Sequence, residues 1–351
     1  KYAKNNNVKV VNIDQLYDLK SLYFISLEYF KLINTTKFKS KKLFNIHFSL
    51  LPAYKGMYTS AHPILNDERE SGCTFHLIND RIDTGDIIFQ KSFKIHPDDF
   101  CSSVYHKYLT CGINLVYEKL DFLINDEYTA TTQSKIGSTY FSKASINYSN
   151  IELNLNTTAF QLGNQIRAYS FRDYQLPIIN DRKNFGYKIL EDQSTRKPGR
   201  LISQSQNKCS LATVDYDIDI YYDNFSDLIN SVKEKEIEGI KHNIAQNPDV
   251  INERDINGWT PLIISVYNGY DDCTKTLLKL GANPNTDNWK GTSPLMYAKD
   301  RAEVSGNTFG LELLIKYGAD KSSKDMFNKS VIDYLNDKGE HYSSIYNLLF
   351  Q

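Results

Sequence analysis

Short apolar runs and one long amphipathic segment fill the first third of the chain. Four runs have the length and composition of buried strands: Val8–Ile13, Leu43–Ile46, Cys73–Ile78 and Ile87–Ile95. Residues 98–124 repeat apolar side chains at helical spacing, in the register Val104, Tyr108, Cys111 and Leu115. Alternation of strands with a helix predicts an α/β layer with a mostly parallel sheet, whose site would lie at the carboxyl ends of the strands.

The middle of the chain, residues 132–223, has a different pattern. A helix candidate at Thr157–Tyr169 precedes four short strand-like pieces: Tyr187–Leu190, Leu201–Ser205, Ser210–Val214 and Ile218–Tyr222. Turn residues such as Lys197-Pro198-Gly199 separate them. This pattern predicts a small β-rich lobe.

The last third, residues 224–351, repeats itself. The octapeptide Asp255–Leu262 is followed 33 residues later by the similar Asn288–Leu295, and Gly281-Ala282-Asn283 recurs 37 residues later as Gly318-Ala319-Asp320. The extra four residues fit an insertion at Glu303–Thr308. The period and the G-x-[TS]-P-L and G-A-[ND] motifs resemble the ankyrin repeat.

The ankyrin resemblance implies an all-α stack of helix pairs. Thr-Pro or Ser-Pro would open the first helix of each repeat, and a glycine would end the second. One repeat cannot bury its own apolar face, so neighbours must stack. Diverged caps are expected at Leu228–Asn252 and Met326–Gln351. The usual histidine of T-P-L-H is replaced by Ile263, Met296 and Asp333.

The composition narrows the class of protein. The 351 residues include 41 Lys+Arg and 42 Asp+Glu, with 41% hydrophobic and 24% charged residues. These values are typical of a globular chain and exclude disorder, collagen and coiled coil as the main architecture. No apolar run approaches the ~20 residues that span a bilayer, and the net charge of −1 gives no reason to bind nucleic acid. We therefore expect neither a membrane nor a nucleic-acid partner.

The five cysteines form no CxxC pair and no metal-type spacing. An odd, sparse set indicates reduced thiols, so we expect a cytoplasmic location and no bound metal. No signal-peptide pattern is present. Because the chain begins with Lys1 rather than Met, we expect the native N-terminus to lie outside this sequence.

Three polar residues near predicted strand ends carry the candidate chemistry. Asn45 and His47 are two apart at the end of a short apolar run, which puts both side chains on one face. Asp83 sits in a Thr-Gly turn just before the next strand. An amide, an imidazole and a carboxylate that meet could polarise a carbonyl, transfer a proton and orient the proton carrier.

Other interpretations of these residues stay open. A single histidine in an α/β core is often a structural hydrogen bonder. His47, His76 and Asp83 could form a two-His-one-carboxylate iron site, but this leaves Asn45 and the Ser-Leu-Leu-Pro turn unexplained. A Ser-His-Asp triad with Ser49 is disfavoured because no G-x-S-x-G elbow is present.

Three motifs together resemble a known enzyme family. They are N-x-H-x-S-L-L-P-x-Y-x-G at Asn45–Gly56, G-x-T-x-H at Gly72–His76, and Asp83-Thr84-Gly85. The combination resembles the formyltransferases that use 10-formyltetrahydrofolate, which include the glycinamide ribonucleotide, methionyl-tRNA and nucleotide-amino-sugar enzymes. The resemblance covers roughly residues 12–214. It implies a Rossmann-like catalytic domain, here residues 1–131, followed by the β-rich lobe, residues 132–223, for substrate binding or dimer formation.

One departure from the family pattern matters. The family begins with a strand and a glycine-containing turn upstream of the Val8 run, and this unit is not in the sequence. We therefore expect that a complete sheet needs residues outside this sequence.

The resemblance also implies residue roles. Asn45, His47 and Asp83 match the catalytic residues: the first two would stabilise the oxyanion formed when a neutral amine attacks the formyl carbon, and Asp83 would hold the imidazole and help to remove the proton. The walls of the folate pocket match Phe24, Ser26, Ile78, Asn79, Asp80 and Arg81.

The formylated amine is best assigned to an amino sugar. The only dense basic cluster is Lys37, Lys39, Lys41 and Lys42, and we interpret it as a solvated loop rather than a tRNA-binding surface. Segments 138–143 and 164–177 resemble the sugar-nucleotide N-formyltransferases, which act on dTDP- or UDP-linked amino sugars for surface polysaccharides such as O-antigen. An ankyrin extension resembles a subset that acts on dTDP-linked amino-dideoxyhexoses.

The expected substrate is therefore a dTDP-3-amino-3,6-dideoxyhexose. The 4-amino isomer, and an ankyrin scaffold with an inactive formyltransferase-like domain, are the alternatives. We also expect a homodimer. The candidate substrate-binding residues are Tyr54, Lys55, Met57, Tyr58, Tyr140, Lys143, Arg167, Tyr169 and Arg172.

The two tryptophans suggest a second ligand site. Aligning the repeats places Trp259 and Trp289 at neighbouring loop tips. Exposed tryptophan at loops favours recognition, so the pair could stack an aromatic ligand, even a second sugar nucleotide. Binding of a protein partner, or buttressing of the small lobe or of a dimer, are the alternatives for the repeats.

Overall fold

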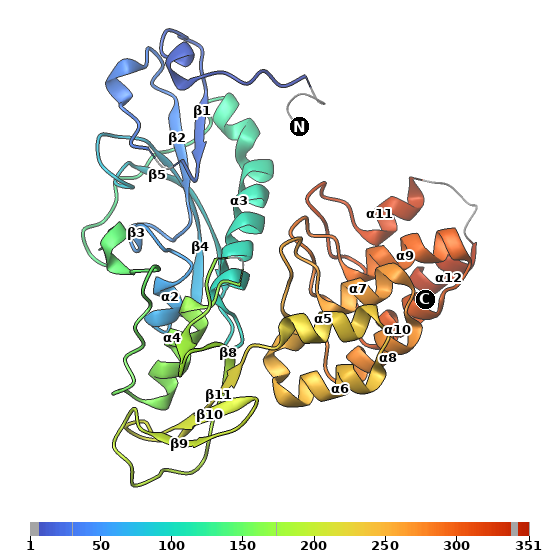
Figure 1. The fold of residues 1–351 in the computed structure, drawn as a ribbon. Helices are drawn as coiled ribbons and strands as arrows, with labels where there is room; N and C mark the ends of the chain where they lie inside the picture. Colours follow the sequence, from blue (N-terminus) through green and yellow to red (C-terminus); the bar gives the residue numbers. More distant parts are fainter. Residues whose placement is uncertain (1–6, 30, 173, 338–342, 351) are drawn as a thin grey trace. The chain divides into compact units, whose positions relative to one another are not determined.

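The computed structural model describes residues 7–29, 31–172, 174–337 and 343–350 (Figure 1). The chain divides into two compact units: residues 1–99 with 103–147, and residues 100–102 with 148–351. The domain boundaries predicted after residues 131 and 223 stay predictions.

The first unit holds a four-stranded sheet, a two-stranded ladder and one long helix. Its elements are η1 (Ile13–Leu16), β1 (Phe24–Leu27), η2 (Thr35–Lys37), β2 (Leu43–His47), β3 (Lys55–Gly56), α2 (His62–Leu65), β4 (Glu70–Leu77), β5 (Ile87–Lys94), α3 (Cys101–Ile124, whose first two residues fall in the second unit), β6 (Tyr140–Phe141) and η3 (Lys143–Ser145).

The sheet is mixed, with the order β1-β2-β4-β5. β1 pairs with β2 in parallel, whereas β2–β4 and β4–β5 are antiparallel. The expectation of a mostly parallel sheet is therefore wrong. Parallel neighbours need a long crossover connection, but β4 and β5 are joined by a short loop, and the only helix between β2 and β4 in the described residues is the four-residue α2.

The predicted strand at Val8–Ile13 is also wrong. Residues 8–12 form no strand, and Ile13 begins the short helix η1. Val8 and Val10 are 55% and 82% exposed. An apolar run becomes a strand only where it finds a ladder partner, and the described sheet instead takes Phe24–Leu27 as the parallel neighbour of β2.

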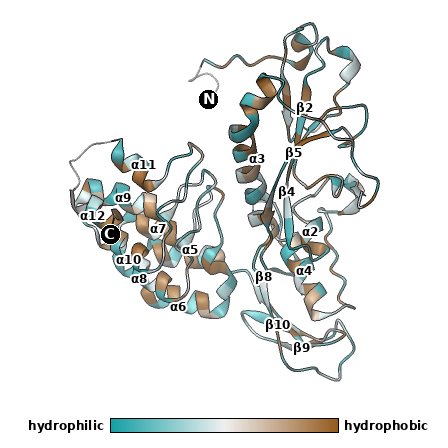
Figure 2. Cartoon of the chain, turned by 180° about the vertical axis from the view of Figure 1, so that it is seen from behind, coloured by the Kyte–Doolittle hydropathy of each residue, from teal (hydrophilic) through white to brown (hydrophobic). Residues whose placement is uncertain are grey.

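Helix α3 packs on this sheet along the predicted stripe. Val104, Tyr108, Cys111 and Leu115 are all buried, which confirms the predicted register, and the helix also carries polar residues along its length (Figure 2). Gly112 of α3 faces the sheet closely: a Cβ added there would lie 3.6–3.7 Å from the side chains of Ile46, Phe48 and Cys73. Close packing therefore fixes α3 against the strands that carry the candidate site.

The second unit begins with a five-stranded antiparallel sheet and one helix, which agrees with the predicted β-rich lobe. The strand order is β7-β8-β11-β10-β9. Its elements are α4 (Ala159–Tyr169), β7 (Ile178–Ile179), β8 (Arg182–Ile189), β9 (Leu201–Gln204), β10 (Lys208–Leu211) and β11 (Ile218–Tyr222).

Stacked helices follow in the same unit. They are α5 (Phe225–Lys233), α6 (Ile237–Gln246), η4 (Pro248–Asn252), α7 (Pro261–Asn268), α8 (Asp271–Lys279), α9 (Pro294–Ser305), α10 (Phe309–Lys316), α11 (Val331–Asn336) and α12 (Ser343–Phe350). One hydrophobic core runs through this stack. The expected N-terminal cap corresponds to α5, α6 and η4, and the C-terminal cap to α11 and α12, with residues 338–342 and 351 outside the described residues.

The local chemistry of the repeats follows the sequence motifs. Thr260 and Ser293 cap α7 and α9 with their hydroxyl groups, and a proline follows each of them. Gly281 and Gly318, which follow α8 and α10, both have positive φ, a conformation that suits glycine. The insertion lengthens α9, which has 12 residues against 8 in α7. These helix boundaries confirm the repeat periodicity.

No helix among the described residues combines the length and the apolar character needed to cross a membrane.

Candidate active site

Asn45 and His47 lie on one side of the central strand β2. Strand alternation buries the apolar residues next to Asn45 in the core, so the two polar side chains share the opposite side. In the ladder, Ser26 of β1 stands beside Asn45, and His76 of β4 stands beside it on the other edge. The amide is therefore the middle of a row of polar residues across three strands.

Asp83 reaches this row from the loop between β4 and β5. Its Oδ2 accepts the Gly56 N–H at 2.9 Å and lies 3.4 Å from His47 Nδ1. Its Oδ1 accepts from Asn45 Nδ2 at 3.4 Å. The structure thus brings the three residues of the sequence motif together, and a backbone N–H of β3 fixes the carboxylate between them.

Both ring nitrogens of His47 face hydrogen-bond acceptors. Nε2 lies 2.8 Å from the Tyr54 carbonyl oxygen, so it carries a proton, while Nδ1 faces Asp83. In the neutral ring, Nδ1 therefore presents its lone pair to a carboxylate. A proton that arrives at Nδ1 would be held between the imidazole and the carboxylate, which suits a proton acceptor supported by Asp83.

Burial and charge oppose each other at this pair. Burial lowers the pKa of His47 below its usual 6.5, although the negative charge of Asp83 works in the other direction. At Asp83 burial disfavours the charge most, but interactions with His76, His47 and the Gly56 N–H outweigh it and hold the pKa of the carboxyl below its usual value. Near neutral pH the pair is a neutral imidazole beside an ionised carboxylate.

The structure adds His76 to the candidate site. The sequence alone suggests this residue only as a metal ligand. Its Nδ1 lies 2.7 Å from the Leu77 carbonyl oxygen, so Nδ1 carries the proton. Nε2 then accepts from Asn45 Nδ2 at 3.1 Å. His76 therefore orients the Asn45 amide, and Asn45 directs its two N–H groups to His76 and Asp83.

The iron-site alternative is wrong. No group of three or more His, Cys, Asp and Glu side chains in the described part of the chain could hold a metal ion. His76 uses both nitrogens in the hydrogen bonds described above. Ser49 is fully buried and donates to the Ala53 carbonyl oxygen at 2.7 Å, a structural role in the turn after β2.

The turn after β2 carries the first group of predicted substrate residues. The Tyr54 hydroxyl donates to Glu68 at 2.6 Å, and burial, helped by this bond, raises its pKa. Lys55 is buried, its amine donates to Ser138 at 2.8 Å, and burial lowers its pKa. Met57 is exposed, as are two predicted residues outside this turn, Tyr140 of β6 and Lys143 of η3. The Tyr58 hydroxyl donates to the Lys143 carbonyl oxygen at 3.2 Å.

The predicted substrate residues of the second unit have structural partners. Arg167 is buried in α4 and donates to Asn164 at 2.6 Å, and Tyr169 ends the same helix, where burial raises its pKa. Arg172 donates to Asp223 at 2.8 Å and lies over the rings of two phenylalanines. Their assignment to the substrate stays a prediction.

The predicted folate residues occupy β1 and the loop after β4. Phe24 packs against Phe38 with 5.4 Å between ring centroids, and Ser26 pairs with Asn45 of β2. Asn79 shapes the loop by accepting from the Arg81 N–H and the Thr84 hydroxyl. The remaining predicted residues are Ile78, which packs beside the Phe38 cluster, and the exposed Asp80. Their contact with folate also stays a prediction.

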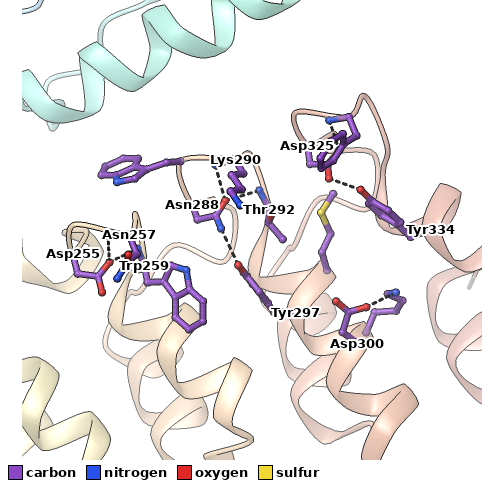
Figure 3. A pocket seen from close by; sticks show the side chains of 14 residues that line it. Asp255, Asn257, Trp259, Asn288, Lys290, Thr292, Tyr297, Asp300, Asp325 and Tyr334 are labelled. Atoms are coloured by element: carbon purple, nitrogen blue, oxygen red, sulfur yellow. Dashed lines mark hydrogen bonds and ion pairs between the residues drawn. The ribbon is translucent and has the colours of Figure 1, made fainter. Parts of the chain in front are cut away.

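A second candidate site lies in the repeats, where the loops before α7, α9 and α11 border a groove of about 920 Å³ (Figure 3). Each loop is closed by an acceptor side chain at the same repeat position: Asp255, Asn288 and Asp325 each accept two or more backbone N–H groups. The groove is lined by Asp255, Asn257, Trp259, Asn288, Trp289, Lys290, Thr292, Met296, Tyr297, Lys299, Asp300, Asp325, Phe327 and Tyr334.

Both tryptophans line this groove, and both are half-buried rather than fully exposed. Trp259 packs 5.4 Å from Tyr297 between ring centroids. Trp289 covers Gly258 and donates its indole N–H to the Ile256 carbonyl oxygen at 3.1 Å. The repeats thus fix an aromatic surface with Lys290 beside it, whereas Lys299 is buried and paired with Asp300 and Glu303.

Known proteins resemble both parts of the chain. Residues 1–120 match the formyl transferase family, and residues 228–325 match ankyrin repeats in three copies. The methionyl-tRNA formyltransferase of Fervidobacterium nodosum is 31% identical over 182 residues, which are 51% of this chain. The match spans 57% of the length of that relative.

Two solved structures resemble the chain more closely. One is the N-formyltransferase from Helicobacter canadensis in complex with folinic acid and dTDP-3-aminofucose: it is 38% identical, with a TM-score of 0.59, and the match covers 63% of this chain and 81% of that one. The other is WlaRD, a sugar 3N-formyltransferase solved in the presence of dTDP and 5-N-formyl-tetrahydrofolate: it is also 38% identical, with a TM-score of 0.59 and coverage of 64% and 80%.

The fold, the Asn-His-Asp site and these matches define a formyltransferase domain joined to ankyrin repeats. The chain belongs to the sugar N-formyltransferases.

Proposed function

We propose that this protein transfers a formyl group from 10-formyltetrahydrofolate to the amine of a dTDP-linked amino sugar, a dTDP-3-amino-3,6-dideoxyhexose. The observation that carries the proposal is the contact of Asp83 with both Asn45 and His47. The similarity to structures with dTDP-3-aminofucose and with dTDP supports the nucleotide and the 3-amino position. The product would enter surface polysaccharide, such as O-antigen, and the reaction would take place in the cytoplasm.

The residues present fit the folate co-substrate, since a neutral amide, an imidazole and a carboxylate are the groups that acyl transfer to an amine needs. The co-substrate supplies an activated formyl carbon when it is bound. Because His47 Nε2 bonds the Tyr54 carbonyl oxygen and Nδ1 faces Asp83, we assign His47 the role of proton acceptor in place of the oxyanion role that the resemblance implied. Its Nδ1 takes the proton that the attacking amine loses, and Asp83 stabilises the resulting imidazolium. Asn45 stabilises the oxyanion at the formyl carbon by turning one N–H from its long 3.4 Å bond to Asp83 toward the oxyanion, a contribution of about 2.7–4 kcal/mol for one such donor. The proton then leaves with the folate nitrogen as its bond to the formyl carbon breaks.

One assay distinguishes the candidate functions. The full chain is incubated with 10-formyltetrahydrofolate and a panel of dTDP- and UDP-linked 3-amino and 4-amino sugars together with methionyl-tRNA. We expect a formyl mass increase on the dTDP-3-amino sugar. Preference for a 4-amino sugar would correct the position of the amine, formylation of the tRNA alone would replace the proposal, and no product with any acceptor would favour the inactive scaffold. Size-exclusion chromatography tests the expected homodimer.

We also propose that the groove of the repeats binds an aromatic ligand such as the base of a nucleotide. The half-buried rings of Trp259, Trp289 and Tyr297 can stack on a base, and Lys290 can pair with a phosphate.

Tryptophan fluorescence tests this groove in the intact protein. The chain has only two tryptophans, and both line the groove, so emission reports on it directly. We expect dTDP to quench the emission with saturation, because stacking changes the surroundings of the indoles. Trp259→Phe, which leaves Trp289 as the sole reporter, should retain the response. An unchanged emission spectrum in the intact protein would end the proposal.

A further inference from the structure

The loop that carries Asp83 needs an external support. Asp83 has a φ of +53°, a left-handed conformation that non-glycine residues adopt infrequently. The loop also runs so close to β4 that a Cβ added to Gly85 would lie 1.7 Å from the Leu77 carbonyl oxygen. A backbone conformation of this kind persists when surrounding contacts hold it.

Gln133 provides such a contact from a distant part of the sequence. A pair of backbone hydrogen bonds between Ile87 and Thr131, each 2.8 Å, brings the segment after α3 beside the start of β5. From there the Gln133 side-chain amide donates to the Asp83 carbonyl oxygen at 2.9 Å and to the Gly85 carbonyl oxygen at 2.7 Å. One NH₂ group therefore bridges the two ends of the turn.

The two ends of the Asp83 residue are held by different elements. The carboxylate accepts the Gly56 N–H from β3, and the backbone is held by Gln133. The Gln133 Oε1 atom is buried and has no hydrogen-bond partner among the described residues. The side chain is therefore held through its NH₂ group alone, and a carboxylate of the same shape could not make these two donations.

We propose that Gln133 is a positioning residue: its amide clamps the Asp83–Gly85 turn and so aims the Asp83 carboxylate at His47 Nδ1. The inference rests on the proposed formyl transfer, because it assigns Gln133 a role in that reaction through Asp83. Gln133 itself is not placed in contact with the substrate.

The direct test is the titration of the His47 ring. NMR of the imidazole in the intact protein follows its protonation, to which Asp83, His76 and Lys55 all contribute. In Gln133→Met and Gln133→Glu the carboxylate should move away from Nδ1. Because the charge of Asp83 favours the protonated ring, we expect His47 to titrate at lower pH than in the wild type in Gln133→Met, which introduces no charge of its own. This readout requires no formyl transfer and stays valid if the proposed function fails.

Kinetics gives the second measurement. A misplaced Asp83 should lower kcat by about 10- to 100-fold and leave the KM for the amino sugar nearly unchanged. Gln90→Met is the matched control, since this amide also makes two donations inside the first unit, to the Leu51 carbonyl oxygen and Thr74 Oγ1. We expect it to affect thermal stability without shifting the His47 titration. Gln133 variants that are folded and less stable, but show the wild-type His47 titration and kcat, would overturn the proposal.

Discussion

Asp83→Asn should reduce kcat for formyl transfer by about 10³-fold, within the range expected for loss of acid–base assistance, with little change in substrate affinity. The substitution keeps the shape of the side chain, and the Gly56 N–H can still donate when the remaining oxygen stands at the Oδ2 position. It removes the negative charge that faces His47 Nδ1 at 3.4 Å. A proton on Nδ1 would then lack its counter-charge, so the imidazole would become a poorer proton acceptor.

The new amide has a second orientation, in which its NH₂ group takes the place of Oδ2, gives up the Gly56 hydrogen bond and binds Nδ1 in the wrong sense. An asparagine NH₂ group beside Nδ1 can donate to the lone pair that the proton must reach, which fixes the ring in a form that cannot accept it. Single-turnover kinetics and equilibrium binding of the dTDP-amino sugar separate the chemical step from affinity. Asp86→Asn, three residues along the same loop, is the matched control and should keep near-normal turnover. A full loss of binding in Asp83→Asn would instead indicate that the loop had been displaced.

The sequence predicted that Asn45, His47 and Asp83 would meet, and the structure brings them together, while their catalytic roles stay predictions. Asn45 and His47 share a face through strand alternation, and Asp83 was recognised from its Thr-Gly turn. His76 was present in the same motif, but its function depends on the antiparallel register that places it beside Asn45. Because we expected a mostly parallel sheet, we had no reason to place His76 beside Asn45.

Long-range contacts explain the other differences. Gln133 lies 50 residues from Asp83, and nothing in its neighbourhood along the chain marks it as part of the site. The apolar run at Val8–Ile13 has the pattern of a buried strand, but a pattern does not provide a ladder partner, and Val8 and Val10 are exposed. In the repeats the motifs themselves contain the capping residues, so their helices were predicted closely. Trp259 and Trp289 are half-buried because of contacts with neighbouring repeats, and their positions at the loop tips in the sequence could not predict those contacts.

His47→Asn should lower kcat by about 10²–10⁴-fold, and it should also change the dependence of kcat on pH. In the wild type His47 must be neutral to accept a proton. Burial lowers its pKa below 6.5, so we expect protonation of the ring to remove activity only below that pH, in addition to the loss that protonation of the substrate amine causes in every variant. In the variant this acid limb should disappear, and the residual rate should follow only the ionisation of the substrate amine.

His62→Asn is the control that assigns the acid limb to His47. His62 is a second buried histidine of the same unit; it bonds Ser145 at 2.9 Å, and burial lowers its pKa to about 4. An acid limb due to His62 would lie near pH 4 and would move in His62→Asn, whereas a limb due to His47 should remain in that variant. Profiles of kcat against pH for the wild type, His47→Asn and His62→Asn show which histidine produces the acid limb. Near-normal turnover in both His47→Asn and Asp83→Asn would refute the assigned roles. The two residues act on the same proton, and no other described side chain contacts both His47 Nδ1 and the Asp83 carboxylate, between which that proton would lie.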